Sequence, residues 1–149
     1  MSRLNGTYKQ GFSIVEMLVV IAIIGFIGSL IFVQLQSSRQ RARDAEREQE
    51  IKSLQNALAI YATNAGKYPP ANTALLPYAA ATLSGSDPVS TNLRDSDALA
   101  QIPLDPINSG NFVYKYETTD GSTYTLTYYL ETDTILGKPS ANNPQRATP

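Results

Sequence analysis

One carboxylate stands inside the most apolar stretch of the sequence. Residues 12–33 contain a single charged side chain, Glu16. A charged carboxylate within an apolar membrane span costs up to a few kcal/mol, and a plain membrane anchor gains nothing from it. The chemistry open to such a group is an ion pair with a cation that shares its dry surroundings. We therefore expect Glu16 to have a dedicated cationic partner.

The composition excludes several kinds of chemistry. The 149 residues include no cysteine and no histidine, so disulfides, thiol catalysis, cysteine-based zinc sites and histidine bases are absent. The formal net charge is −1, and acidic residues outnumber basic ones from residue 66 onward. Neither feature favours binding to nucleic acid.

Two weaker groups of residues allow alternative interpretations. Asp95 and Asp97, with Asp105 nearby, could offer oxygen ligands to calcium, but helix caps and turns are the preferred explanation for them. A tyrosine-rich group could stack on single-stranded DNA or sugars, although packing within a sheet is preferred. Its members are Tyr114, Tyr116, Tyr124, Tyr128 and Tyr129.

A single helix is expected over residues 12–65, and this helix positions Glu16. Its apolar part, 12–33, is roughly 33 Å long as a helix, enough to cross a bilayer. Its second part, 34–65, is rich in helix formers and has one apolar stripe. The stripe consists of Ile51, Leu54, Leu58 and Tyr61. Gly25 and Gly28 are the weak points of this helix, where we expect flexibility, and Gly66 is expected to end it.

Charged residues crowd the stretch 39–52 and are expected to form a solvated helix face. Opposite charges at helical spacing occur as Arg41 with Asp44, Arg43 with Glu46 and Glu48 with Lys52, each pair adding only a few tenths of a kcal/mol. For the basic cluster 39–43, contact with anionic lipid headgroups and pairing with acids of neighbouring subunits are equally open. Glu131 and Asp133 are likewise expected to be solvated.

The remainder, residues 66–149, is expected to form a head with a small antiparallel sheet. Loop-like sequence with two short helical segments, near 73–81 and 91–100, precedes alternation of apolar and polar residues. That alternation predicts a β-hairpin over 112–131 with a tight turn at Asp120-Gly121. A third strand is expected at 134–136, and the tail 137–149 is expected to be loose. Since a hairpin alone is marginal in water, the apolar stripe of the long helix should cover it, which makes the fold α+β.

The segment 10–16, QGFSIVE, resembles the prepilin peptidase site of type IV pilins and pseudopilins. The resemblance extends over residues 9–70 and covers the short basic leader, the glycine, the aromatic residue and the acid at the fifth position after the cut. It implies a leader at 1–11, cleavage between Gly11 and Phe12, N-methylation of Phe12, a transmembrane and filament-core helix at 12–33, a stalk helix at 34–65 and a head at 66–149.

The resemblance also supplies the cationic partner that Glu16 requires. Cleavage creates an α-amine on Phe12, which lies about 6 Å from Glu16 along the helix axis. This is too far for a good pair within one chain, but a neighbouring subunit shifted along the axis could bring its amine to Glu16. We expect this buried pair to select the stagger of subunits in a filament, as buried polar groups select register in coiled coils.

The first expectation for function is therefore a structural subunit of a type IV pilus, and not an enzyme. The resemblance implies as partners further copies of the chain, other pilins, the prepilin peptidase and an ATPase-driven assembly platform. It implies location in the cytoplasmic membrane as a single-pass precursor and then in a filament at the cell surface. No cofactor is expected, with calcium as a weak candidate. One alternative is a pseudopilin of a type II secretion or competence machine. A more distant one is a bitopic membrane protein with an exported ligand-binding domain.

Overall fold

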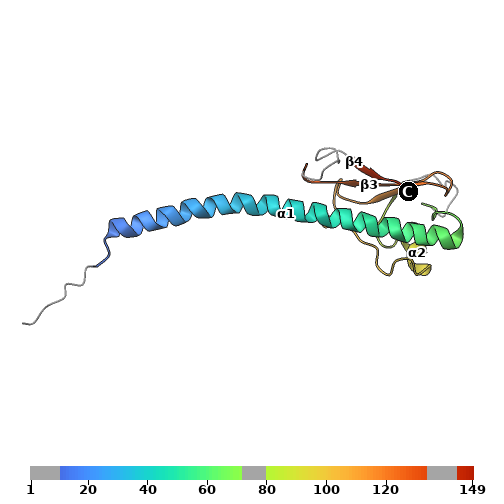
Figure 1. The fold of residues 1–149 in the computed structure, drawn as a ribbon, viewed down its shortest axis with the longest axis horizontal. Helices are drawn as coiled ribbons and strands as arrows, with labels where there is room; N and C mark the ends of the chain where they lie inside the picture. Colours follow the sequence, from blue (N-terminus) through green and yellow to red (C-terminus); the bar gives the residue numbers. More distant parts are fainter. Residues whose placement is uncertain (1–10, 72–79, 134–143) are drawn as a thin grey trace, which may run out of the picture. The chain divides into compact units, whose positions relative to one another are not determined.

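A computed structural model of the chain describes residues 11–71, 80–133 and 144–149. The elements, in chain order, are helix α1 (Ile14–Ala65), strand β1 (Ala81–Thr82), helix α2 (Pro88–Asp95) and strands β2 (Lys115–Thr118), β3 (Tyr124–Tyr129) and β4 (Pro144–Ala147) (Figure 1). The chain forms two units, Met1–Ser38 and Arg39–Pro149. One long helix and a small antiparallel sheet confirm the expected α+β class.

Helix α1 contains 52 residues and no proline. It begins two residues later than expected and ends at Ala65, as the sequence predicts. Gly66 has a φ of 75°, in the left-handed region that glycine adopts without steric cost, and its N–H donates to the carbonyl of Ala62 at 2.8 Å. This is the glycine cap expected from the sequence.

Four antiparallel strands form one sheet in the order β1-β2-β3-β4. The predicted hairpin is present as β2 and β3, with Tyr116 opposite Leu126 and Thr118 opposite Tyr124. Side chains along β3 alternate between buried and half-buried, so one face of the sheet is covered and the other meets solvent. Strand β1, which the sequence did not predict, extends the hairpin on the other side of β2.

The turn between β2 and β3 contains the expected Asp120-Gly121 pair. Gly121 has a φ of 79°, and Asp120 accepts a hydrogen bond from the N–H of Ser122 at 2.8 Å. A Cβ atom at Gly121 would lie 3.2 Å from the Cβ of Lys67. Glycine is therefore required here both for its backbone conformation and for the close approach of the chain after α1.

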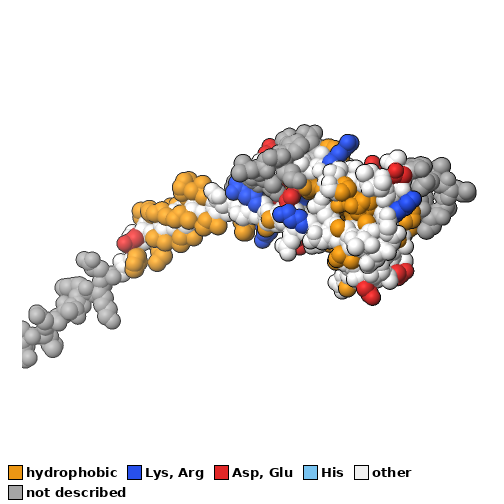
Figure 2. All heavy atoms as spheres, turned by 45° about the vertical axis from the view of Figure 1, so that its right-hand side comes forward, with side chains coloured by type: hydrophobic (Ala, Val, Ile, Leu, Met, Phe, Trp, Pro, Cys, Tyr) orange, Lys and Arg blue, Asp and Glu red, His pale blue; other side chains and the backbone are white. Residues whose placement is uncertain are grey.

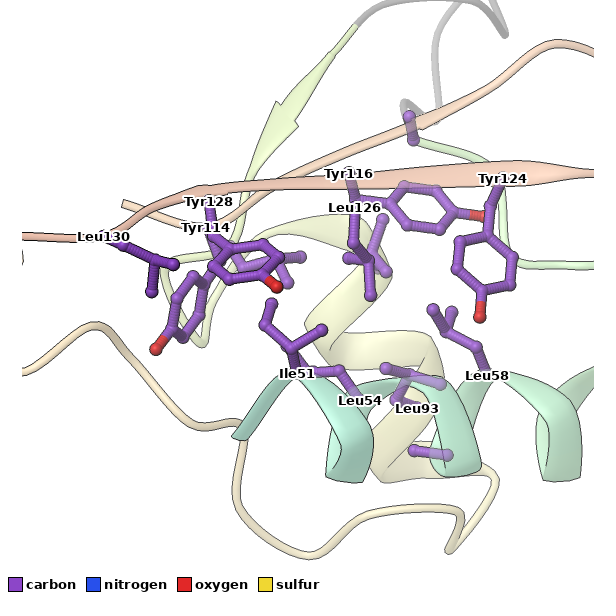
Figure 3. Close-up of a cluster of buried hydrophobic side chains, with 14 residues drawn as sticks. Ile51, Leu54, Leu58, Leu93, Tyr114, Tyr116, Tyr124, Leu126, Tyr128 and Leu130 are labelled. Carbon is purple, nitrogen blue, oxygen red and sulfur yellow. The ribbon is translucent and has the colours of Figure 1, made fainter. Parts of the chain in front are cut away.

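The core of the second unit lies between α1, α2 and the covered face of the sheet. Figure 3 shows leucines and an isoleucine from the helices meeting tyrosines and leucines from the sheet. The expected stripe of α1 supplies Ile51, Leu54 and Leu58, all at most 2% exposed, and Tyr61 packs at its margin. Four tyrosines of the group considered as a stacking surface are buried in this core: Tyr114, Tyr116, Tyr124 and Tyr128. Sheet packing is therefore the correct interpretation for these four.

Helix α2 starts earlier than the sequence predicted. The expectation was a helical segment at 91–100 capped by Ser90 or Thr91, whereas the helix spans Pro88–Asp95. Its cap is Asp87, which accepts the N–H of Ser90 at 2.9 Å, and Pro88 occupies the first turn, where its fixed φ suits a helix.

The C-terminal tail corrects another prediction. Residues 144–147 were expected to be loose, but they form β4, which pairs with β3 and buries Gln145 beneath the sheet. Pro144 is tolerated because β4 is an edge strand, where one row of backbone groups needs no partner. The predicted third strand at 134–136 and most of the predicted helical segment at 73–81 lie outside the described residues.

Candidate functional site

The first turn of α1 contains the carboxylate that the sequence singles out. Ser13 caps the helix: its Oγ accepts the N–H of Val15 at 3.3 Å and its carbonyl accepts the N–H of Met17 at 3.2 Å. Glu16 lies in this first turn, three residues after the cap, which is the spacing of a capping box. A carboxylate here also complements the positive end of the helix dipole. This local role of Ser13 was missed in the sequence, although the spacing itself signals it.

The apolar side chains on either side of Glu16 in the sequence form an exposed surface in the first unit. Figure 2 shows hydrophobic side chains covering this part of α1, and Phe12, Ile14 and Phe32 are each at least 68% exposed. The most apolar window of α1 has a mean hydropathy of 2.7, which is enough, with its length, to cross a membrane. Such a surface is stable only against lipid or other apolar helices.

Gly25 and Gly28 lie inside α1, and the helix is not interrupted at either residue. Apart from the adjacent residues and the backbone of the surrounding helical turns, a Cβ atom built on either would meet no atom within 4 Å. Close packing in the isolated chain therefore does not require glycine at these positions, and their expected role in helix flexibility remains a prediction.

The second unit contains a buried network of ionic side chains that the sequence did not predict. Its centre is Arg47, which is fully buried. Its guanidinium donates to both carboxylate oxygens of Asp105, at 2.7 and 3.0 Å, and through Nη1 to Asp44 and Glu131, both at 2.8 Å. The guanidinium carbon also lies 4.8 Å from the centre of the Phe112 ring. One side chain of α1 is thus bonded to two separate loop segments.

Arg43 completes this ion-pair network, which we define as Arg43, Asp44, Arg47, Asp105 and Glu131. Arg43 makes a two-pronged contact with Glu131, at 2.7 and 2.6 Å. Asp44 accepts the backbone N–H groups of Glu131 and Thr132, at 2.9 and 2.8 Å. The segment after β3 is therefore held to α1 through both its side chain and its backbone.

Proton affinities in the ion-pair network follow from these contacts. Hydrogen bonds from Arg43 lower the pKa of Glu131, with a further contribution from Arg47. Burial acts to lower the pKa of Arg47, but hydrogen bonds to Asp105 and Glu131 outweigh it and raise that pKa. The network holds one more carboxylate than guanidinium.

These contacts correct the expectation of a solvated charged face. Asp44 and Arg47 are fully buried. Arg43 pairs with Glu131 instead of the predicted Glu46. Asp44 pairs with Arg47, three residues on, instead of the predicted Arg41. The partners come from loops distant in sequence, so helical spacing alone could not identify them.

Two acids of α1 accept hydrogen bonds from buried tyrosines of the sheet. Tyr114 donates its hydroxyl to Glu50 and Tyr128 donates to Glu48. Burial raises the pKa of both phenols, and the hydrogen bonds to these acids add to the rise. The polar ends of the core tyrosines are thereby satisfied within the protein.

The calcium candidates do not form one cluster of free carboxylates. Asp105 is engaged by Arg47 and also accepts the backbone N–H of Ile107 at 2.8 Å. Asp95 and Asp97 are exposed. Within residues 11–71, 80–133 and 144–149, no group of three or more acidic, histidine or cysteine side chains is arranged to hold a metal ion.

A long helix with an apolar, acid-bearing start and an antiparallel sheet after it define the class of type IV pilin-like proteins. Comparisons with known families agree: residues 6–32 match the prokaryotic N-terminal methylation motif, and residues 34–139 match protein G of the type II secretion system (T2SS). The chain belongs to the type II secretion system protein G family.

Curated relatives carry the same description. The chain is 32% identical over 105 residues to the "Type II secretion system core protein G" of Escherichia coli (strain K12), covering 69% of this chain and 70% of that protein. It is 29% identical over 98 residues to the protein of the same name from Aeromonas hydrophila, covering 66% and 67%. No solved structure gave a significant match. The comparisons favour the pseudopilin alternative over the pilus subunit that was the first expectation.

Proposed function

We propose that this chain is a pseudopilin, a structural subunit of a filament that belongs to a type II secretion machine. The observation that carries the proposal is the exposed apolar start of α1 with its single carboxylate, Glu16, behind the sequence Gly11-Phe12. The match to the protein G family over residues 34–139 supports secretion, in place of the surface pilus expected first.

Maturation by a prepilin peptidase fits the start of the chain. The N-terminal methylation motif matches residues 6–32, and we place the cut between Gly11 and Phe12. Phe12 then carries the new amine, which stays positively charged at neutral pH with or without a methyl group. The chain is in this respect the substrate of an enzyme and acts itself as a structural part.

Assembly through α1 follows from the exposed surface and from Glu16. Before assembly, residues 12–33 span the cytoplasmic membrane; in the filament, the same side chains pack against the helices of other copies. Exchanging lipid for apolar helices is nearly neutral, so packing and polar contacts decide the balance. Glu16 paired with the Phe12 amine of a neighbouring copy selects the stagger, because leaving either charge bare in a dry bundle costs about 3–5 kcal/mol.

The test combines processing, assembly and secretion in cells that lack the native gene. We expect the N-terminus of the assembled protein to be a methylated Phe12. Gly11→Leu should leave the full-length precursor, because a bulky residue replaces the smallest one at the cut.

Glu16→Ala should be cleaved normally yet give at least tenfold less filament and secreted substrate, because a loss of about 3–5 kcal/mol exceeds the roughly 1.4 kcal/mol that corresponds to a tenfold change. Conservative Glu16→Asp is the control and should retain part of both. A mature protein that begins at Met1, or full secretion by the Glu16→Ala variant, contradicts the proposal.

A further inference from the structure

A groove in the second unit has one acidic wall, which α1 forms, and an uncharged wall opposite it. It has a volume of about 320 Å³ and lies between α1 and the segment that follows α2. Glu46, Gln49 and Glu50 line it from α1, and Gln101 lines it from the opposite wall. Within the described parts of the chain, no ion pair involves Glu46 or Glu50. Among the described residues, the groove therefore presents two carboxylates that no cation contacts directly, although the charge of Arg47 acts on Glu50 from a distance.

The half-buried position of Glu50 in the groove wall disfavours the negative charge of its carboxylate. Its carboxylate is half-buried and accepts the hydroxyl of Tyr114. Burial raises the pKa of Glu50, and the negative charges of Glu46 and Asp105 add to the rise, although the Tyr114 hydrogen bond and the charge of Arg47 oppose it. A positive group that entered the groove would stabilise both carboxylates.

The same helix presents a cation on its other side. Arg41 is exposed and, among the described residues, forms no ion pair. At about 100° per residue, Arg41 and Glu50 lie about 180° apart around α1, and Arg41 and Glu46 about 140° apart. Arg41 therefore cannot reach the groove of its own chain. In a polymer of parallel copies related by a shift along the axis, opposite sides of the helix meet, so Arg41 of one copy faces the groove of the next.

The shift that this contact needs has the same direction as the shift that Glu16 needs. Bringing Arg41 level with Glu46 or Glu50 of a neighbour requires a displacement of about 8 to 14 Å along the helix axis. Bringing the Phe12 amine level with Glu16 of a neighbour requires about 6 Å in the same direction. Both contacts therefore join copies that are shifted in the same direction along the axis.

We propose that the acidic groove at Glu46 and Glu50 is a docking site for Arg41 of a second copy of this chain. This inference rests on the proposed assembly into a filament and adds a second contact that selects the register, made by the exposed surfaces of neighbouring copies. Charged contacts between subunits contribute specificity by making wrong registers place like charges together.

Charge reversal in the full-length chain tests the contact. Arg41→Glu alone and Glu46→Arg alone place like charges at every contact, and we expect each to reduce filament yield at least about tenfold. Cells that produce both variants together can build alternating filaments in which every contact pairs opposite charges. We therefore expect mixed filaments at half of the wild-type yield or more, although neither variant assembles alone.

Two matched controls carry the same charge change at exposed sites. Arg39→Glu lies on the groove side of α1, and Lys52→Glu lies on the side of Arg41 but about 16 Å further along the axis. Both should retain near-normal filament yield. Equal membrane levels and normal processing of all variants show that loss of yield reflects assembly and not folding.

Three results would overturn the inference. They are normal assembly of Arg41→Glu alone, failure of the paired variants to assemble together, and loss of assembly in both controls. Failure of the pair while Arg41→Glu is defective assigns Arg41 to lipid headgroups. Wild-type filaments must form in the same cells; their absence contradicts the proposed function itself and is thereby distinguished from failure of this contact.

Discussion

Arg41 and Arg47 lie six residues apart on α1, yet their surroundings differ completely. Arg41 is exposed, whereas Arg47 is fully buried among Asp44, Asp105 and Glu131. A buried guanidinium is expensive to desolvate, and only several hydrogen-bonded carboxylates offset that cost. At the scale of residues, the ion-pair network therefore joins α1 to two loop segments.

Replacing Arg47 should destabilise the second unit strongly. Arg47→Met leaves the buried Asp105 and Asp44 without their cation, and breaking such a network from one side costs about 3–5 kcal/mol. Thermal unfolding of the full chain in detergent measures the change. Lys52→Met, at an exposed site of the same helix, is the control and should change stability by less than about 0.5 kcal/mol. Equal stability of the two variants would contradict the structural role of Arg47.

The ion-pair network also predicts an acid sensitivity. The pKa of Glu131 is lowered in the folded state, chiefly by Arg43, so Glu131 contributes stability that is present above its unfolded pKa of about 4.3. That contribution is lost as the pH falls through the lowered folded pKa. We expect the stability difference between the wild type and Glu131→Gln to shrink steadily below about pH 4.5. A difference that stays constant from pH 6 to 3 would contradict this assignment.

At the scale of elements, the two halves of α1 differ in which side chains they expose, although they belong to one helix. Its first half exposes apolar side chains in all directions, and its second half buries only one side against the sheet. Strand β4, in contrast, forms although its sequence pattern does not predict a strand. Four residues with weak strand propensity form an edge strand because β3 offers an open row of backbone groups and the core offers space for Gln145.

Removing β4 should therefore weaken the head. A chain that ends at residue 143 loses the strand paired with β3, and it uncovers the core beside Leu126 and Tyr128. Because fully exposing one such side chain costs about 1.5–3 kcal/mol, we expect a clear fall in the unfolding temperature of the full chain in detergent. Removal of Pro149 alone, which is exposed, should change little. A truncated chain as stable as the wild type would show that β4 contributes no stability.

At the scale of the whole molecule, the isolated subunit is incomplete. The first unit exposes an apolar surface that needs lipid or other helices, and the second has an acidic groove and an exposed cation on opposite sides of α1. Within its own fold, however, the second unit satisfies its buried polar groups internally. Among the described residues, no buried side-chain nitrogen or oxygen lacks a hydrogen-bond partner.

This internal satisfaction predicts that calcium does not stabilise the head. The carboxylate of Asp105 already accepts hydrogen bonds from the guanidinium of Arg47. A metal stabilises a fold only to the extent that it binds the folded state. The unfolding temperature should be the same in calcium and in a chelator. An increase of several degrees with calcium would mean that Asp95, Asp97 or other acids form a site after all. Asp97→Ala would then test whether that site includes Asp97.

Sequence patterns alone predict the long helix, its C-terminal cap, the hairpin and the pilin-like start. These features depend on neighbours a few residues away: Gly66 ends α1, Asp120-Gly121 turns the hairpin, and QGFSIVE carries its signal in seven adjacent positions. The helix stripe and the alternation of the strands also identified most of the core.

Sequence patterns do not show which charges are solvated and which are buried, because this depends on contacts made in the folded chain. Arg47, Asp105 and Glu131 lie 26 to 84 positions apart and meet because the sheet and its loops fold back on α1. The same applies to the tail, since β4 exists only where β3 leaves an edge open. Local spacing cannot report such contacts, because the energy of a charge depends on its solvent, and its solvent depends on the packing of the whole unit.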